Sequence, residues 1–120
     1  MISVAAGPHL DHLEACLLLS LAERPAYGYQ LKRSLAELDL DVPDLGRIYR
    51  TLRSMEERGL VESRWDTGGS GPARRTYELT AAGGDQLQAQ AAAVRRSRRA
   101  LTRFLGRYER LALPHSGAVA

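Results

Sequence analysis

The sequence predicts a mainly helical protein with one small β-hairpin and a long C-terminal helix. Apolar residues recur at helical spacing between residues 9 and 58. Two short alternating segments then enclose a glycine-rich loop, and residues 80–111 continue as one helical pattern. A period near 3.6 residues indicates helix and alternation indicates strand. With 120 residues, the chain has room for one modest core.

The first two predicted helices are short and carry leucines on one face. In residues 9–22 the leucines recur every three or four positions, and Pro25 then disfavours helix at the residue before it. Residues 26–29 open the second helix, which spans residues 27–38. Both helices are therefore expected to bury one face against the rest of the domain.

The third predicted helix, residues 44–58, has two contrasting faces. Asp44 is a suitable N-cap, and Gly59 is suited to end the helix in a left-handed conformation. The apolar face comprises Leu45, Ile48, Leu52 and Met55. The opposite face comprises Gly46, Arg47, Arg50, Arg53 and Ser54, with Tyr49 on its flank. One face is expected to be buried, and the other is expected to present arginines to a partner.

A hairpin is predicted from strands at residues 60–65 and 74–79, joined by a loop at residues 66–73. Gly68, Gly69 and Gly71 in the loop allow close approach of the backbone to a phosphate, and Arg74 and Arg75 add charge at its base. The alternative is an ordinary hairpin loop. A nucleotide-binding glycine loop is disfavoured, because this loop leads into a strand and not into a helix N-terminus. Trp65 is expected to pack the hairpin against the helices.

The last helix is predicted to begin after Thr80 as its N-cap and to run to about residue 111, before Pro114. That length far exceeds the average of about 11–12 residues. A 4-3 spacing, here called the apolar stripe, runs through Leu87, Ala91, Val94, Arg98, Leu101, Leu105, Tyr108 and Ala112. Such a stripe needs a second molecule to cover it. Homodimerisation is therefore predicted through Leu87, Val94, Leu101, Leu105 and Tyr108.

The charge distribution favours an anionic partner. Residues 1–43 hold six acids and three bases, net −3, while residues 81–120 hold seven bases and two acids, net +5. Helix 27–38 followed by helix 44–58 and a glycine-rich hairpin is the order of a winged helix-turn-helix, whose second helix enters the DNA major groove. The alternative is that Arg50, Arg53 and Arg58 only pair with Glu56 and Glu57 on a solvated surface.

Three sequence blocks resemble the PadR family of bacterial transcriptional regulators. They are LLLSLAERPAYGYQLKRSL, GRIYRTLRSMEERGLVESRW and GPARRTYELTAAG, within residues 13–87. The resemblance implies a winged helix that dimerises through its C-terminal helix, as in the shorter-tailed subfamily. It also implies a sequence-specific DNA-binding regulator, a ligand-relieved repressor acting as a homodimer on a pseudo-palindromic operator. The DNA contacts that it implies are Arg47, Tyr49, Arg50, Arg53, Gly71, Arg74 and Arg75.

Two other functions stay open from the sequence. His9, His12 and Cys16 share one helix face and suit zinc or copper, although Cys16 also suits a small buried apolar position. A winged-helix adaptor that binds protein is the other alternative, supported by Glu56, Glu57, Glu62 and Asp66. Phe104 and Tyr108 are expected to pack, with a small-molecule effector pocket between subunits as the alternative. No set of catalytic residues emerges, so no enzyme activity and no cofactor is expected.

The domain organisation follows from these elements. A winged helix-turn-helix is predicted at residues 9–79, a dimerisation helix at 80–112, and flexible tails at 1–8 and 113–120. The single Cys16 cannot form an internal disulfide, and neither a targeting signal nor a bilayer-spanning run is visible. The protein is therefore expected in the cytoplasm, with DNA and a second copy of itself as partners and no membrane.

Overall fold

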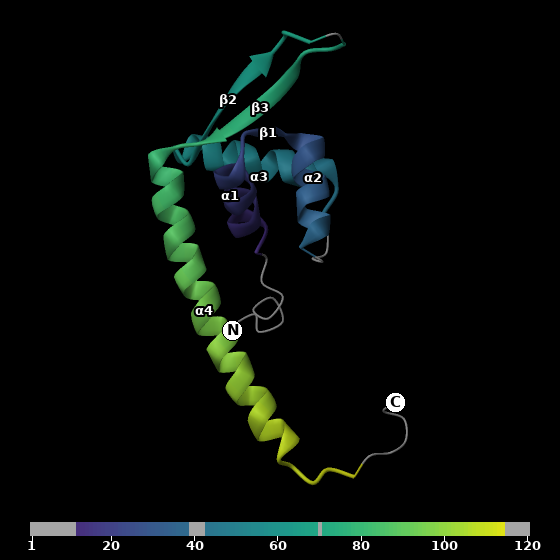
Figure 1. The fold of residues 1–120 in the computed structure, drawn as a ribbon, viewed down its shortest axis with the longest axis vertical. Coiled ribbons are helices and arrows are strands. Elements are labelled where there is room, and N and C mark those ends of the chain that lie inside the picture. The colour runs from purple at the N-terminus through teal and green to yellow at the C-terminus, as the bar shows by residue number, and fades with distance from the viewer. Residues whose placement is uncertain (1–11, 39–42, 70, 115–120) are drawn as a thin grey trace. The chain divides into compact units, whose positions relative to one another are not determined.

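The computed structural model describes residues 12–38, 43–69 and 71–114. The chain divides into two compact units, residues 1–89 and 90–120, and α4 contributes to both. The predicted fold class is confirmed, because the described chain is mostly helical, with a small antiparallel sheet and a long final helix (Figure 1). The elements are α1 (Leu13–Glu23), β1 (Ala26–Tyr27), α2 (Gly28–Glu37), α3 (Leu45–Glu57), β2 (Val61–Asp66), β3 (Arg74–Leu79) and α4 (Ala81–Glu109).

The sheet has three strands in the order β1-β3-β2, so the prediction that residues 26–27 open a helix was wrong. Ala26 pairs with Tyr77, and Tyr27 pairs with Thr76 of β3. Tyr27 is extended, with φ −107° and ψ 172°, and it caps α2 while its backbone N–H donates to Gln30 Oε1 at 3.0 Å. The pairing with β3, about fifty residues later, therefore decides the conformation of these two residues.

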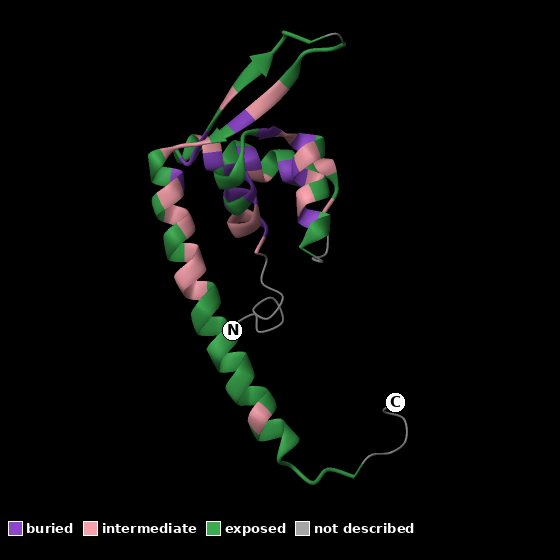
Figure 2. Cartoon of the chain, in the orientation of Figure 1, coloured by how far each residue is buried: buried purple, intermediate pink, exposed green. Residues whose placement is uncertain are grey.

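The core of the first unit is built from the leucine faces of α1 and α2 and the apolar face of α3. Its largest fully buried side chains are Leu17, Leu18, Leu31, Leu35, Ile48, Leu52, Met55 and Val61. Figure 2 shows these helices carrying the buried residues, whereas the C-terminal half of α4 is exposed on nearly every face. The buried stripe predicted for α3 is confirmed at Ile48, Leu52 and Met55, with Leu45 half-buried at its start.

Three predicted helix caps are confirmed, and two of them join α3 to α4. Asp44 accepts a hydrogen bond from the backbone N–H of Arg47 at 2.8 Å. Gly59 has φ +78°, and its N–H and that of Leu60 donate to carbonyls in the last turn of α3. The Thr80 hydroxyl accepts from the N–H of Gly83 at 3.0 Å and donates to the carbonyl of Gly59 at 2.7 Å. The hairpin is therefore anchored at its base.

Gly83 fills a position where a side chain has no room. A Cβ there would lie 2.2 Å from the carbonyl oxygen of Leu60, which is itself held by the N–H of Thr80 at 3.1 Å. We expect Gly83→Ala to lower the free energy of unfolding by about 1–3 kcal/mol through overpacking. Urea denaturation at fixed protein concentration measures this change.

Gly84→Ala is the matched control, because nothing lies within 4 Å of the Cβ that it adds. It is expected to leave stability unchanged or to raise it by up to about 1 kcal/mol, since alanine favours helix over glycine. Equal stability of the two variants would contradict the close packing of α4 on the base of the hairpin.

Parts of the sequence prediction lie outside the described residues. Residues 1–8, His9 and His115 are among them, as is all of the segment 113–120 except Leu113 and Pro114. Among the helices that the structure describes, none has the length and apolar character needed to cross a membrane.

Candidate nucleic-acid interface

The arginine face of α3 is exposed, as the sequence predicts. Arg47, Arg50 and Arg53 are exposed, whereas Ile48 and Leu52 on the same helix are completely buried. The buried face fixes the rotation of α3 against the core, so the arginines are held toward solvent by packing and not by chance. The helix thus presents a row of long, charged donors.

The alternative reading, in which α3 arginines are neutralised by nearby glutamates, finds no support at Arg50 or Arg53. Within the described residues, the two ion pairs are Arg58 with Glu14 and Arg64 with Glu78. Glu56 instead accepts a hydrogen bond from the Ser63 hydroxyl at 2.8 Å. Among the arginines of the α3 face, Arg50 and Arg53 therefore have no carboxylate partner in the described part of the chain.

Tyr49 connects α3 to the start of α2. Its hydroxyl lies against Gly28, where an added Cβ would come within 2.3 Å of the phenol oxygen. The side chain is 39% exposed, so one edge of the ring remains open to solvent. Gly28 therefore allows the two helices of the helix-turn-helix to approach closely, and Tyr49 faces the space between α2 and the hairpin.

The predicted packing of Trp65 against the helices was wrong. Trp65 is 60% exposed and pairs in register with Arg75 of β3. The guanidinium of Arg75 lies 5.3 Å from the centroid of the indole ring, within the range of a cation–π contact. Arg74 makes the same kind of contact with Tyr27, at 4.6 Å. The hairpin therefore uses its aromatic rings to hold arginines, not to fill the core.

The charge of the wing lies at its base and not at its tip. The loop between β2 and β3 contains no arginine or lysine, and Gly71 within it has φ +112°. The carboxylate of Asp66 accepts from the N–H of Gly68 at 3.1 Å. Arg74 and Arg75 follow the loop, at the start of β3. Phosphate attraction by the wing is therefore expected at these two residues, with Gly71 shaping the loop beside them.

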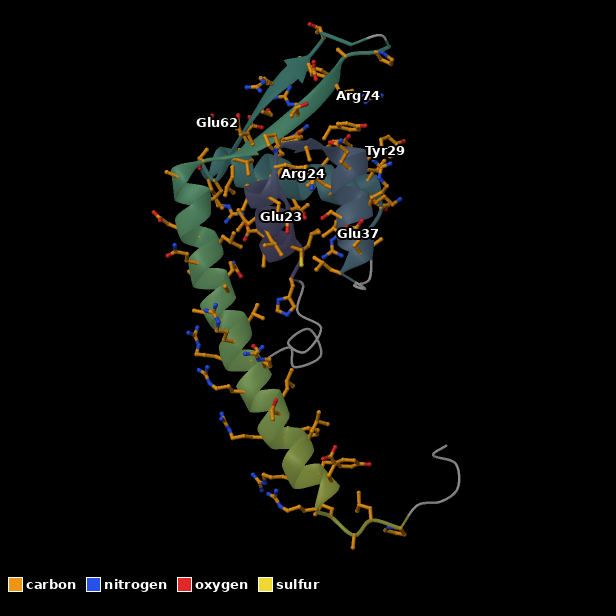
Figure 3. The ribbon with its side chains drawn as sticks, in the orientation of Figure 1. Glu23, Arg24, Tyr29, Glu37, Glu62 and Arg74 are labelled. Carbon is orange, nitrogen blue, oxygen red and sulfur yellow. The ribbon has the colours of Figure 1, made fainter. Side chains whose placement is uncertain are left out.

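An open pocket of about 890 Å³ lies between α2, α3 and the hairpin. Its charged lining residues are Arg33, Arg53, Arg74, Arg75 and Glu56. Its aromatic lining residues are Tyr27, Tyr29, Tyr49, Trp65 and Tyr77. We call this hollow the arginine pocket. Figure 3 labels two of its residues, Tyr29 on α2 and Arg74 on the hairpin.

Two features of the arginine pocket escaped sequence reasoning. Tyr29 and Arg33 on α2 were not among the predicted site residues, and no sequence pattern marks them, because only the fold brings α2 beside the hairpin. Burial raises the pKa of the Tyr77 phenol, although the nearby Arg75 opposes that rise. Tyr77 therefore stays a neutral hydroxyl at neutral pH.

The C-terminal half of α4 has two chemically different sides. Val94, Leu101, Leu105 and Tyr108 of the apolar stripe are exposed. At about 100° per residue, six arginines fall within an arc of about 120° on the other side. They are Arg95, Arg96, Arg99, Arg103, Arg107 and Arg110. Figure 3 shows nitrogen-tipped side chains along one edge of this segment.

Leu87, at the start of the apolar stripe, is half-buried and packs against the core of the first unit. Its predicted part in dimerisation, like that of the four exposed residues, stays a prediction. Of the metal candidates, Cys16 is half-buried against the same core, and the described residues contain no cluster of three ligands. His12 precedes α1, and His9 lies outside the described residues.

Comparison with known proteins identifies the family. The sequence model of the Transcriptional regulator PadR-like family matches residues 17–89. A PadR family transcriptional regulator from Eggerthella lenta is 31% identical, with a TM-score of 0.71 over 84% of this chain and 88% of that one. A PadR-like transcriptional regulator from Bacillus cereus is 25% identical, with a TM-score of 0.71 over 86% and 97%.

More distant similarity extends to a structure that contains DNA. Bacillus subtilis PadR in complex with operator DNA is 22% identical, with a TM-score of 0.58 over 64% of this chain and 45% of that one. It shares the winged-helix fold. No curated protein matches the chain. With the family model covering more than half of its residues, the chain belongs to the PadR-like family of transcriptional regulators.

Proposed function

We propose that the protein is a sequence-specific DNA-binding transcriptional regulator that acts as a homodimer on a pseudo-palindromic operator. The observation that carries this proposal is the arginine face of α3, held outward by a completely buried opposite face. Recognition helices contact base edges mainly through their N-terminal residues. Arg47 and Arg50 lie in the first half of α3 and are therefore assigned to the bases.

Arginine suits both parts of this interaction. Its planar guanidinium donates two hydrogen bonds to guanine O6 and N7, and it also pairs with phosphate. Arg74 and Arg75 at the base of the wing are assigned to the DNA backbone, where contacts position the protein without specifying sequence. Tyr49, Arg53 and Gly71 complete the proposed interface. Support comes from the Bacillus subtilis relative, which was solved with operator DNA.

Dimerisation is proposed through the apolar stripe. In the described chain, its exposed residues have no apolar partner that covers them, and contiguous exposed apolar surface of this kind marks an interaction site. A symmetric pairing would bury the stripe twice and leave the six-arginine face in solvent. Two recognition helices related by a two-fold axis would then match the two halves of a pseudo-palindrome.

The regulator is proposed to act in the cytoplasm as a repressor that occupies an operator and blocks polymerase. A small-molecule effector bound between two C-terminal helices would favour a dimer whose recognition helices no longer match the half-site spacing. No enzyme activity, cofactor or membrane partner is proposed. The single C-terminal helix matches the shorter-tailed type of PadR protein.

Salt dependence of DNA binding tests the proposed function against a protein-binding adaptor. The purified protein should bind DNA from its own upstream region, and counterion release makes that affinity fall as salt rises. For a dimer with 6–10 phosphate contacts, the loss between 50 and 200 mM salt is roughly 10³–10⁵-fold. Fluorescence anisotropy with labelled duplex measures it. Absence of salt-sensitive binding across this region would favour the adaptor.

A further inference from the structure

The arginine pocket has the charge of an anion site. Its lining carries four arginines and one glutamate, a net charge of +3. Neither of the two ion pairs between described residues involves one of these four arginines. The glutamate, Glu56, is engaged by the Ser63 hydroxyl at 2.8 Å. The four guanidinium groups thus converge without a carboxylate partner from the described residues, which favours an anion as the missing partner.

The aromatic rings of the pocket orient two of these arginines. Arg74 lies over the Tyr27 ring at 4.6 Å and Arg75 lies over the Trp65 ring at 5.3 Å. A guanidinium that stacks through its flat face keeps its N–H donors in the plane of the group, available to oxyanions. The stacking also restricts the side chains before any ligand binds, which lowers the entropic cost of ordering them.

The polar groups match a phosphate diester more closely than a carboxylate. Hydroxyl groups from Tyr27, Tyr29 and Tyr49 add neutral donors to the guanidinium groups on three different elements. An open hollow of about 890 Å³ has room for a stretch of sugar-phosphate chain with several oxygens at different positions. Phosphate contacts in protein–DNA complexes come from arginine and tyrosine side chains of this kind.

We infer that the arginine pocket binds phosphodiester groups of the DNA backbone, and that Tyr29 and Arg33 of α2 belong to the DNA interface. This inference rests on the proposed DNA-binding function. The DNA strand that enters the pocket would contact α2, α3 and β3 together, because each contributes an arginine or tyrosine. The pocket then fixes the register of the duplex, and the first half of α3 specifies the sequence.

Arg33→Gln tests the assignment, with Arg64→Gln as the matched control. Arg64 is an exposed arginine of β2 that pairs with Glu78 and does not line the arginine pocket. If Arg33 binds a phosphate, Arg33→Gln should reduce the slope of log affinity against log salt by about 0.9 per bound protomer. The affinity should fall to a similar degree on cognate and random duplex. Arg64→Gln should keep the wild-type slope.

Fluorescence of Trp65, the single tryptophan of the chain, gives a second readout. Because its ring is 60% exposed and lines the pocket, DNA binding by the wild type should change its emission. Circular dichroism and thermal melting confirm that both variants fold. An unchanged slope in folded Arg33→Gln, or an unchanged Trp65 emission on DNA binding, would overturn the pocket assignment. A wild type without salt-sensitive DNA binding would instead overturn the proposed function.

The phosphate group could also come from a soluble phosphorylated compound, and inorganic phosphate distinguishes this source. At matched ionic strength, phosphate and chloride should displace DNA to the same relative extent from the wild type and from Arg33→Gln. This result supports the DNA backbone as the occupant. A stronger effect of phosphate on the wild type, absent in Arg33→Gln, would contradict the backbone assignment and indicate a soluble ligand.

Discussion

Leu101→Asp is expected to convert the protein from a dimer to a monomer and to abolish specific DNA binding. Leu101 is 59% exposed in the described chain and lies in the middle of the apolar stripe. Burying a leucine contributes roughly 1.5–3 kcal/mol, and symmetry doubles the effect. A buried unpaired carboxylate costs several kcal/mol more, so the substituted interface should not form. A monomer would contact only one half of the operator, and its affinity would be too low for specific binding.

Arg103→Asp provides the matched control for this substitution. Arg103 lies on the same helix, two residues further along and on the six-arginine face, away from the apolar stripe. It should therefore remain dimeric. Size-exclusion chromatography with light scattering at micromolar concentration measures both variants. A wild type that is monomeric at this concentration would contradict the dimer and remove the basis for a palindromic operator.

The helix ends were predictable from the sequence because their determinants are local. Asp44 accepts from the N–H of Arg47, three residues later, and the positive φ of Gly59 satisfies the last turn of α3. Thr80 likewise caps α4 through Gly83. Each of these interactions joins residues that are close along the chain. The buried face of α3 was predictable for the same reason, since helical periodicity needs only the order of residues.

The two errors concern residues whose conformation is set by distant partners. Ala26 and Tyr27 form a strand because β3 offers them a free edge, and no local pattern reveals that pairing. Trp65 faces solvent because the register of the hairpin places it across from Arg75. A one-residue change of register would have turned its side chain to the other face of the sheet. Size and hydrophobicity alone therefore misassigned it to the core.

The candidate site was predicted only where it lies on single elements. The arginines of α3 and the base of the wing follow from helical periodicity and from the glycine-rich loop. Tyr29 and Arg33 are exposed or half-exposed polar positions of α2 until α2, α3 and β3 converge around the arginine pocket. Leu87 shows the same limit, because its place in the apolar stripe did not reveal that it also packs against the core of its own unit.

The central claim is that α3 specifies the DNA sequence while the wing contacts the backbone. Arg50→Ala should weaken binding to the cognate operator by about 1–3 kcal/mol for each half-site, hence about 2–6 kcal/mol for a symmetric dimer. The loss on random DNA should be much smaller, because only the cognate site offers the base that Arg50 contacts. Arg75→Ala, which changes the same charge on β3, should weaken both duplexes about equally.

The decisive measurement is the free-energy difference between cognate and random duplex for the wild type and these two variants, at one salt concentration. The structure predicts that this difference shrinks in Arg50→Ala and stays constant in Arg75→Ala. A constant difference in Arg50→Ala together with a reduced one in Arg75→Ala would contradict the assignment of sequence recognition to the exposed face of α3.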